Sequence, residues 1–203
     1  MSSAAVSVSK ESRELMGMSA GKFAMWSFIA SDGMGFAGLF AAYSATRATA
    51  EWWPNPNDAG VLAVDLTAFN TFILICSSVT MVFALKACKA GDQKGTSRML
   101  LATILGGCAF LGVQVYEYYH LVHDGVLPWT DNFSATFYAL TCYHGLHVLT
   151  GVIYLTCIYI ASLKGRYGPD NSMPVEIVGL FWHFVDLVWI LLFTFVYLFE
   201  PLT

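Results

Sequence analysis

The sequence predicts an all-α integral membrane protein, a single bundle of five transmembrane helices. Hydrophobic residues make up 57% of its 203 residues and charged residues only 12%. Soluble domains are about one-quarter charged, so this composition excludes a soluble globular fold. The mean hydropathy of +0.60 agrees with this interpretation. A formal net charge of -4 offers no basic surface for phosphate backbones, which excludes nucleic acid as a partner.

The spans are predicted from apolar runs, because a helix needs about 20 mostly apolar residues to cross the hydrocarbon core. The first run follows Lys22 and precedes a connection that contains Pro54 and Pro56. The second follows these prolines and precedes Gly91 and Gly95, which favour a turn. The first two spans are therefore expected at about 22–44 and 61–87.

Three further runs are bounded in the same way. Arg98 begins the third, Asn132 begins the fourth and Pro174 begins the fifth. No connection is long enough to form a second domain. The remaining spans are therefore expected at about 98–122, 132–162 and 174–200, within one five-helix domain (22–203) that follows an N-terminal segment (1–21).

The charged residues between the runs predict the orientation of the bundle. With the N-terminus in the cytoplasm, all ten Lys and Arg residues except Arg47 fall on the cytoplasmic side. An excess of Lys and Arg is typical of cytoplasmic segments. We therefore expect residues 1–21 to be cytoplasmic and the C-terminus to lie outside.

The cysteines carry no clear signal of a disulfide or metal site. None of the five belongs to a C-x-x-C motif, and most fall inside apolar runs. We therefore expect them to be small buried hydrophobic residues rather than disulfide partners or zinc ligands. They are Cys76, Cys88, Cys108, Cys142 and Cys157.

Six ionisable side chains fall inside the expected spans. Each costs about 2.5 to 3.5 kcal/mol at mid-bilayer and therefore needs a partner or a function. Counting along each helix at about 1.5 Å per residue predicts two layers. The inner to middle layer holds Asp32, His183 and Asp186, and the outer layer holds Glu117, His144 and His147 together with the uncharged Gln114.

Several interpretations of these polar residues remain open. They occur as i,i+3 pairs on one helix face, which favours interhelical hydrogen bonds that fix the packing. A metal site would combine His144, His147 and Glu117, with His183 as a ligand from the other layer. A haem site would need histidines on two facing helices, whereas His144 and His147 stand side by side. A proton or ion path would use Asp32.

The aromatic residues allow two interpretations as well. They are either core and lipid-facing residues or the lining of a quinone or lipid pocket. A small transporter is a further alternative, but the chain shows no internal repeat and no proline in the middle of a span. The aromatic residues in question are Tyr116, Tyr118 and Tyr119 in the third span and Phe181, Trp182, Trp189 and Phe193 in the fifth.

Five motifs occur in chain order in the five spans. They are S-D-G-M-G-F-A-G (31–38), N-T-F-I-L-I-C-S-S-V-T (70–80), G-V-Q-V-Y-E-Y-Y-H (112–120), F-Y-A-L-T-C-Y-H-G-L-H-V-L-T-G (137–151) and F-W-H-F-V-D-L-V-W (181–189). Together they resemble the signatures of subunit III of the haem-copper terminal oxidases, in the five-helix bacterial form. Two positions depart from the family pattern. Many cytochrome c oxidase members have Glu where this chain has Asp32, as some quinol oxidase members do, and Cys142 replaces a Gly.

The resemblance implies a function for the chain as part of a complex. Members of the family pack on subunit I, hold lipid in a cleft, stabilise the catalytic core and support proton uptake while dioxygen is reduced to water. Haem and copper lie in partner subunits, so the chain itself would carry no catalytic centre, cofactor or metal. The positions that the resemblance makes packing or cleft-lining residues are Asp32, Gln114, Glu117, His144, His147, Trp182, His183 and Asp186.

The implied partners are oxidase subunits I and II and membrane phospholipid, with a small subunit IV and a donor complex as further candidates. The implied location is the bacterial cytoplasmic membrane, which the chain would cross several times. Two alternatives remain. Within the family, the host enzyme is a quinol oxidase; outside it, the chain is a membrane metal or haem protein that uses His144, His147 and Glu117.

Overall fold

The computed structural model describes residues 14–15, 18–50, 53 and 64–198. The prediction of an all-α fold is confirmed, with one antiparallel pairing of two-residue strands as the only strand structure among these residues. Residues 1–13 and the terminal residues 61–63 and 199–200 of two expected spans lie outside the described residues. The elements are β1 (Glu14–Leu15), β2 (Met18–Ser19), α2 (Ala20–Thr49), α3 (Val64–Lys89), α4 (Gln93–His123), α5 (Asn132–Leu163), the 3-10 turn η1 (Pro169–Asn171), α6 (Met173–Phe193) and the π-helical turn η2 (Thr194–Leu198).

Five long helices are present at the five predicted positions, and four of them have the length and composition of membrane spans. These four are α3, α4, α5 and α6 with η2. α2 contains 30 residues, which is also long enough at about 1.5 Å per residue. It is not among the four because none of its stretches is apolar enough to qualify as a span by composition. The chain is therefore a membrane protein with four clear spans and a fifth long helix.

Capping side chains set the starts of α4 and α5. The Asp92 carboxylate accepts a hydrogen bond from the backbone N–H of Gly95 at 2.9 Å, and Asp131 accepts one from Ser134 at 2.7 Å. An acidic N-cap satisfies backbone donors that have no partner within the helix. α4 therefore begins five residues before the expected span at Arg98, because the cap, not the apolar run, determines where the helix begins.

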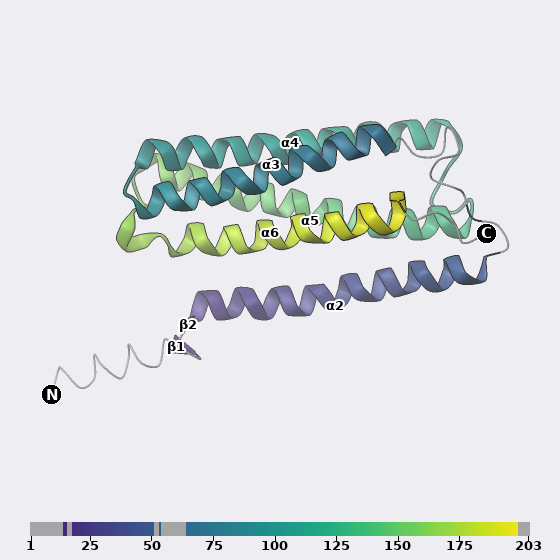
Figure 1. Ribbon diagram of the computed structural model, residues 1–203, viewed down its shortest axis with the longest axis horizontal. Helices are drawn as coiled ribbons and strands as arrows, with labels where there is room; N and C mark the ends of the chain where they lie inside the picture. The colour runs from purple at the N-terminus through teal and green to yellow at the C-terminus, as the bar shows by residue number, and fades with distance from the viewer. Residues whose placement is uncertain (1–13, 16–17, 51–52, 54–63, 199–203) are drawn as a thin grey trace.

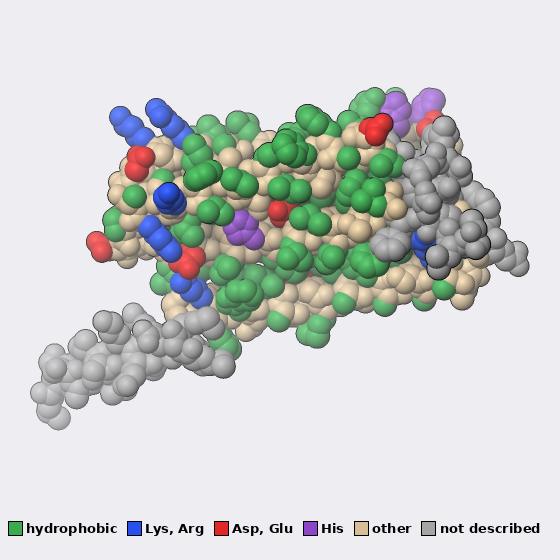
Figure 2. Space-filling model, in the orientation of Figure 1, with side chains coloured by type: hydrophobic (Ala, Val, Ile, Leu, Met, Phe, Trp, Pro, Cys, Tyr) green, Lys and Arg blue, Asp and Glu red, His purple; other side chains and the backbone are tan. Residues whose placement is uncertain are grey.

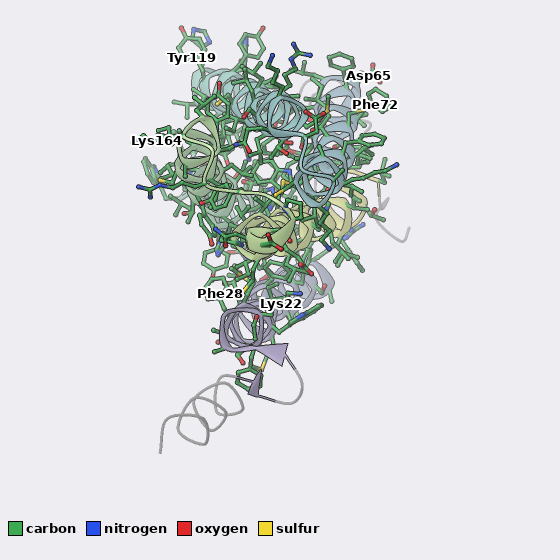
Figure 3. All side chains as sticks on the ribbon, turned by 90° about the vertical axis from the view of Figure 1, so that its left-hand side faces the viewer. Lys22, Phe28, Asp65, Phe72, Tyr119 and Lys164 are labelled. Atoms are coloured by element: carbon green, nitrogen blue, oxygen red, sulfur yellow. The ribbon has the colours of Figure 1, made fainter. Side chains whose placement is uncertain are left out.

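The helices form a four-helix bundle with one additional helix outside it. α3, α4, α5 and α6 each contact the next, and α6 closes the bundle against α3. α2 packs on the outside of this bundle against α5 and α6 (Figure 1). Figure 3 looks along the bundle and shows Phe72 and Tyr119 pointing outwards, where they are 61% and 68% exposed. In a membrane protein such side chains face lipid or partner subunits.

The core of the bundle is built around buried aromatic side chains. Trp182 is fully enclosed, and its indole lies between two glycines of neighbouring helices. A Cβ atom at Gly107 would lie 2.6 Å from the ring and one at Gly151 would lie 2.9 Å from it. Both distances are shorter than any ordinary carbon contact, so only glycine lets α4 and α5 approach this ring.

Four of the five cysteines contradict the expectation of burial. Only Cys88 is buried, and the thiols of the other four are on exposed positions of the helices. An apolar run does not distinguish the bundle interior from a lipid-facing surface, because both are apolar. The expectation was therefore wrong for Cys76, Cys108, Cys142 and Cys157.

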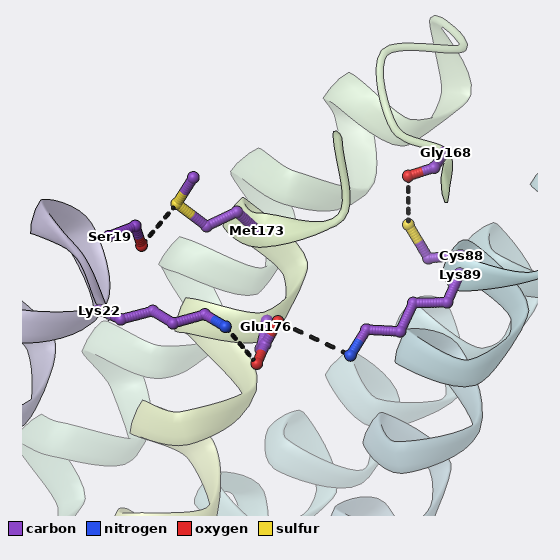
Figure 4. A network of polar contacts seen from close by, with 7 residues as sticks. All are labelled: Ser19, Lys22, Cys88, Lys89, Gly168, Met173 and Glu176. Carbon is purple, nitrogen blue, oxygen red and sulfur yellow. Dashed lines mark hydrogen bonds and ion pairs between the residues drawn. The ribbon is translucent and has the colours of Figure 1, made fainter. Parts of the chain in front are cut away.

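Positive charge is concentrated at one end of the molecule. The described Lys and Arg residues cluster where α2, α4 and α6 begin and α3 and α5 end, whereas Arg47 lies at the opposite end (Figure 2). One acidic side chain joins three helices at this basic end. Lys22 of α2 lies 2.7 Å and Lys89 of α3 lies 3.7 Å from the carboxylate of Glu176 on α6 (Figure 4). This ion-pair network holds α2 against the bundle.

Candidate functional site

The Asp32 cluster, formed by Asp32, Tyr143 and His147, joins α2 to α5. Asp32 Oδ1 accepts a hydrogen bond from the Tyr143 hydroxyl at 2.9 Å. Its other oxygen lies 3.1 Å from Nε2 of His147, and the two side chains are only 9% and 14% exposed. The rings of Phe36 and His147 lie 5.2 Å apart, which helps to enclose the cluster.

The hydrogen bonds around His147 determine where its ring carries a proton. Nδ1 lies 2.7 Å from the backbone carbonyl oxygen of Tyr143, and that oxygen can only accept. Nδ1 therefore donates, which leaves Nε2 facing the Asp32 carboxylate. A second proton at Nε2 forms an imidazolium beside the carboxylate. That proton joins the two side chains, which without it would be two hydrogen-bond acceptors facing each other at 3.1 Å.

The position of Asp32 differs from the layer predicted for it. Counting residues from the helix end separates Asp32 from His147, and this separation is wrong. The count assumes that all helices start at the same level. In the structure Asp32 is the thirteenth residue of α2, whereas His147 is the seventeenth residue from the end of α5, so α5 extends beyond the start of α2 at this end.

The Glu117 cluster consists of Thr67, Glu117 and Tyr197 and lies toward the other end of the bundle. One carboxylate oxygen of Glu117 accepts hydrogen bonds from the Thr67 hydroxyl at 3.1 Å and from the Tyr197 hydroxyl at 3.0 Å. Glu117 is buried, with 6% of its surface exposed. The cluster joins α3, α4 and η2. Neither hydroxyl was expected as a partner from the sequence.

The face of α3 that contacts α6 supplies further hydroxyl partners. Ser78 and Nδ1 of His183 lie 2.7 Å apart. Trp182 donates its indole N–H to Ser77 at 3.1 Å, and Trp189 donates to Thr71 at 2.9 Å. Sequence reasoning gave these α3 hydroxyls no role. Their seven-residue spacing, which keeps Thr71 and Ser78 on one helix face, is the signal that could have identified them.

His144 and Gln114 lie in the interior of the bundle. His144 is fully buried, and its ring packs 4.8 Å from that of Trp189 and 5.7 Å from that of Phe110. Among the described residues neither ring nitrogen has a hydrogen-bond partner. Gln114 donates from its side-chain amide to the hydroxyl of Tyr118 at 3.0 Å. Asp186 of α6 is also buried, and one of its oxygens has no partner among these residues.

The predicted metal ligands do not converge. His144 faces the aromatic core, His147 faces Asp32 of α2, and Glu117 binds the two hydroxyls described above. Within the described ranges, no three His, Cys, Asp or Glu side chains are close enough together to hold a metal ion. The arrangement therefore does not favour a metal protein that uses these three residues.

A groove of 350 Å³ lies beside the Asp32 cluster, where α2 meets α5 and α6. Phe181 is the only aromatic residue of the predicted pocket sets that lines it. Trp182 and Trp189 are buried in the core, whereas Tyr116 and Tyr119 point outwards. The groove is lined by Met25, Phe28, His147, Thr150, Tyr154 and Phe181.

Comparison with known proteins connects this arrangement to one family. Residues 9–200 match the family model of cytochrome c oxidase subunit III. A probable cytochrome c oxidase subunit 3 of Nocardia farcinica is 39% identical over 84% of this chain and 83% of its own length. A cytochrome bo(3) ubiquinol oxidase subunit 3 of Pseudomonas putida is 34% identical over 85% of this chain and 83% of its own. A quinol oxidase subunit 3 of Bacillus subtilis is also 34% identical, over 85% and 84%.

The match extends over all five helices and includes every polar cluster among the described residues. It agrees with the motif resemblance seen in the sequence. The chain therefore belongs to the cytochrome c oxidase subunit III family.

Proposed function

We propose that the chain is the non-redox subunit III of a bacterial haem-copper oxidase of the cytochrome c type, in the cytoplasmic membrane. The observation that carries this proposal is the 39% identity to a cytochrome c oxidase subunit 3 over most of both chains. Haem and copper are held by partner subunits, where dioxygen is reduced to water. This chain stabilises that catalytic core and supports its proton uptake.

In this proposal α2 is the fifth membrane span of a single domain, residues 22–203, and packs on subunit I. α2 lies at the edge of the bundle, with Met34 70% exposed on its surface. A Cβ atom at Gly38 would meet nothing within 4 Å, so a partner helix can approach closely there. The basic end of the bundle faces the cytoplasm, as the distribution of Lys and Arg supports. The C-terminus then lies outside.

The groove beside the Asp32 cluster is the proposed lipid cleft. Its lining is mostly apolar, with His147 and Thr150 as polar groups, and suits an acyl chain with a polar group nearby. The remaining polar positions have packing roles in this proposal, because hydrogen bonds between helices fix their register. These positions are Gln114, Glu117, His144, Trp182, His183 and Asp186.

The Asp32 cluster is the proposed contribution to proton supply. Asp32 belongs to α2, the helix that would contact subunit I, and faces His147 of α5 at 3.1 Å. A proton held there is available to a channel in that subunit. This matters most at high pH, because free protons in solution are then scarce and delivery to the channel limits turnover.

The test is the pH profile of oxygen consumption by the purified complex with Asp32→Ala in this chain. Turnover should match that of the unchanged complex at low pH and fall below it as pH rises. Asp186→Asn is the matched control, because it removes another buried carboxylate without changing the Asp32 cluster. Equal amounts of subunit I must co-purify with each variant. An Asp32→Ala profile that overlies the unchanged one would refute the proton role.

A quinol oxidase is the second candidate for the host enzyme. Two relatives of 34% identity carry quinol oxidase names, and Asp32 is the acid found in some members of that group. The electron donor is bound by other subunits, so the haem spectrum and the donor-binding subunit of the purified complex distinguish the two candidates.

A further inference from the structure

A second groove lies between α4 and α5 at the basic end of the bundle. Its volume is 320 Å³, and it is lined by Gln93, Lys94, Ser97, Arg98, Leu101, Tyr159 and Leu163. It is separate from the groove beside the Asp32 cluster, which lies between α2, α5 and α6. No role has been assigned to it above.

Two cations on one face of α4 make this groove positively charged. Lys94 and Arg98 are four residues apart, so both side chains project from the same side of the helix. Among the described residues, neither has an ion-pair partner. Two acidic groups at this end are already engaged, and a third, Asp170, is on η1, which contacts α3 and does not line the groove. Asp92 caps α4, and Glu176 binds Lys22 and Lys89.

The uncharged polar side chains Gln93 and Ser97 of the groove already have hydrogen-bond partners within the protein. Gln93 donates its side-chain N–H to the backbone oxygen of Ser162. The hydroxyls of Ser97 and Ser162 lie 2.8 Å apart, and Ser97 also donates to the Gln93 backbone oxygen at 3.0 Å. These bonds fix α4 against α5. They leave the two cations available for an anion.

The apolar part of the groove has residues at two levels of the spans: Leu101 lies deeper, whereas Leu163, the last residue of α5, lies level with Gln93. Leu101 is about 12 Å along the axis from Gln93, at about 1.5 Å per residue, whereas Arg98 is about 8 Å from it. Leu101 is 39% and Leu163 60% exposed, and Tyr159 is half-buried beside them. Along α4 the site thus passes from two cations near the helix start to the apolar Leu101 toward mid-membrane, and on α5 Tyr159 lies one turn inward of Leu163. This order matches a phospholipid, with its phosphate outermost and its chains below.

We propose that this groove binds one anionic phospholipid, with its phosphate between Lys94 and Arg98 and an acyl chain along Leu101 and Tyr159. Cations near the ends of spans attract anionic headgroups, and long basic side chains reach the headgroup level. A free phosphate ion would use the cations but not the apolar surface. The bound lipid bridges α4 and α5 at the end where Ser97 and Ser162 already join them.

Native mass spectrometry of the intact complex, purified through a tag on this chain, tests the proposal. The complex is titrated with phosphatidylglycerol and with phosphatidylcholine of the same acyl chains. One phosphatidylglycerol should bind preferentially. Lys94→Gln with Arg98→Gln should weaken that binding about thirtyfold, since each cation near an anionic headgroup contributes about a factor of five.

The matched control is Lys164→Gln with Arg166→Gln, which removes two charges that follow α5 and do not line the groove. This pair should leave the affinity within about twofold. Leu101→Trp, which fills the apolar part and keeps both charges, should also weaken binding. The proposal is overturned if the two double variants behave alike, if phosphatidylcholine binds equally well, if Leu101→Trp has no effect, or if inorganic phosphate displaces the lipid.

Discussion

At the scale of single residues, the polar groups inside the bundle are stabilised by hydroxyl and indole partners. Glu117 shows the pattern, with Thr67 and Tyr197 both donating to one oxygen. The sequence identifies such an acid easily, because a charged residue in an apolar run is conspicuous. It does not identify the partners, because threonine, serine and tyrosine are common in spans and usually bond to their own helix. The polar positions could be predicted, whereas their pairing required the structure.

Trp182 provides a test at this scale. Gly107→Ala should destabilise the protein by about 1–3 kcal/mol, because the added methyl group overlaps a fully buried ring that cannot move aside. The midpoint of thermal unfolding in detergent measures the effect. Gly112→Ala is the control on the same helix, where an added Cβ meets nothing within 4 Å. Equal midpoints for the two variants would show that the Trp182 contact does not limit packing.

At the scale of helices, amino-acid composition predicts that a helix is present better than it predicts where the helix begins or how it is placed against its neighbours. The apolar runs locate α3 to α6, because 20 or more apolar residues require a span. α4 begins before its apolar run because Asp92 caps the helix there. The stagger of α2 was missed because nothing within one helix fixes its height against another. That height depends on contacts such as Lys22 with Glu176, which join residues far apart in the sequence.

The edge position of α2 gives a prediction at this scale. Gly38→Leu should reduce the amount of subunit I that co-purifies with the chain, because the side chain would fill a surface that the proposal assigns to a partner helix. The chain itself should fold, since nothing within 4 Å is displaced. Gly112→Leu places the same side chain at an equally open position of α4. If both variants retain subunit I equally, α2 is not the contacting helix.

At the scale of the molecule, the chain is a bundle with a basic end, polar clusters among its helices and an apolar outer surface. No three metal-ligating groups converge among the described residues, and the family match extends from residue 9 to residue 200. The five sequence motifs alone indicated this family, because their polar residues resemble the family's signatures in all five helices.

The most direct test of this account is purification from native membrane in a mild detergent through a tag on this chain, with a reduced-minus-oxidised spectrum and mass spectrometry of the co-purified proteins. The account predicts that haem-copper subunits I and II co-purify and that their haem bands appear. The haem type and the donor-binding subunit then distinguish cytochrome c from quinol as the electron source. A chain that purifies alone with its own stoichiometric metal or haem would contradict the account.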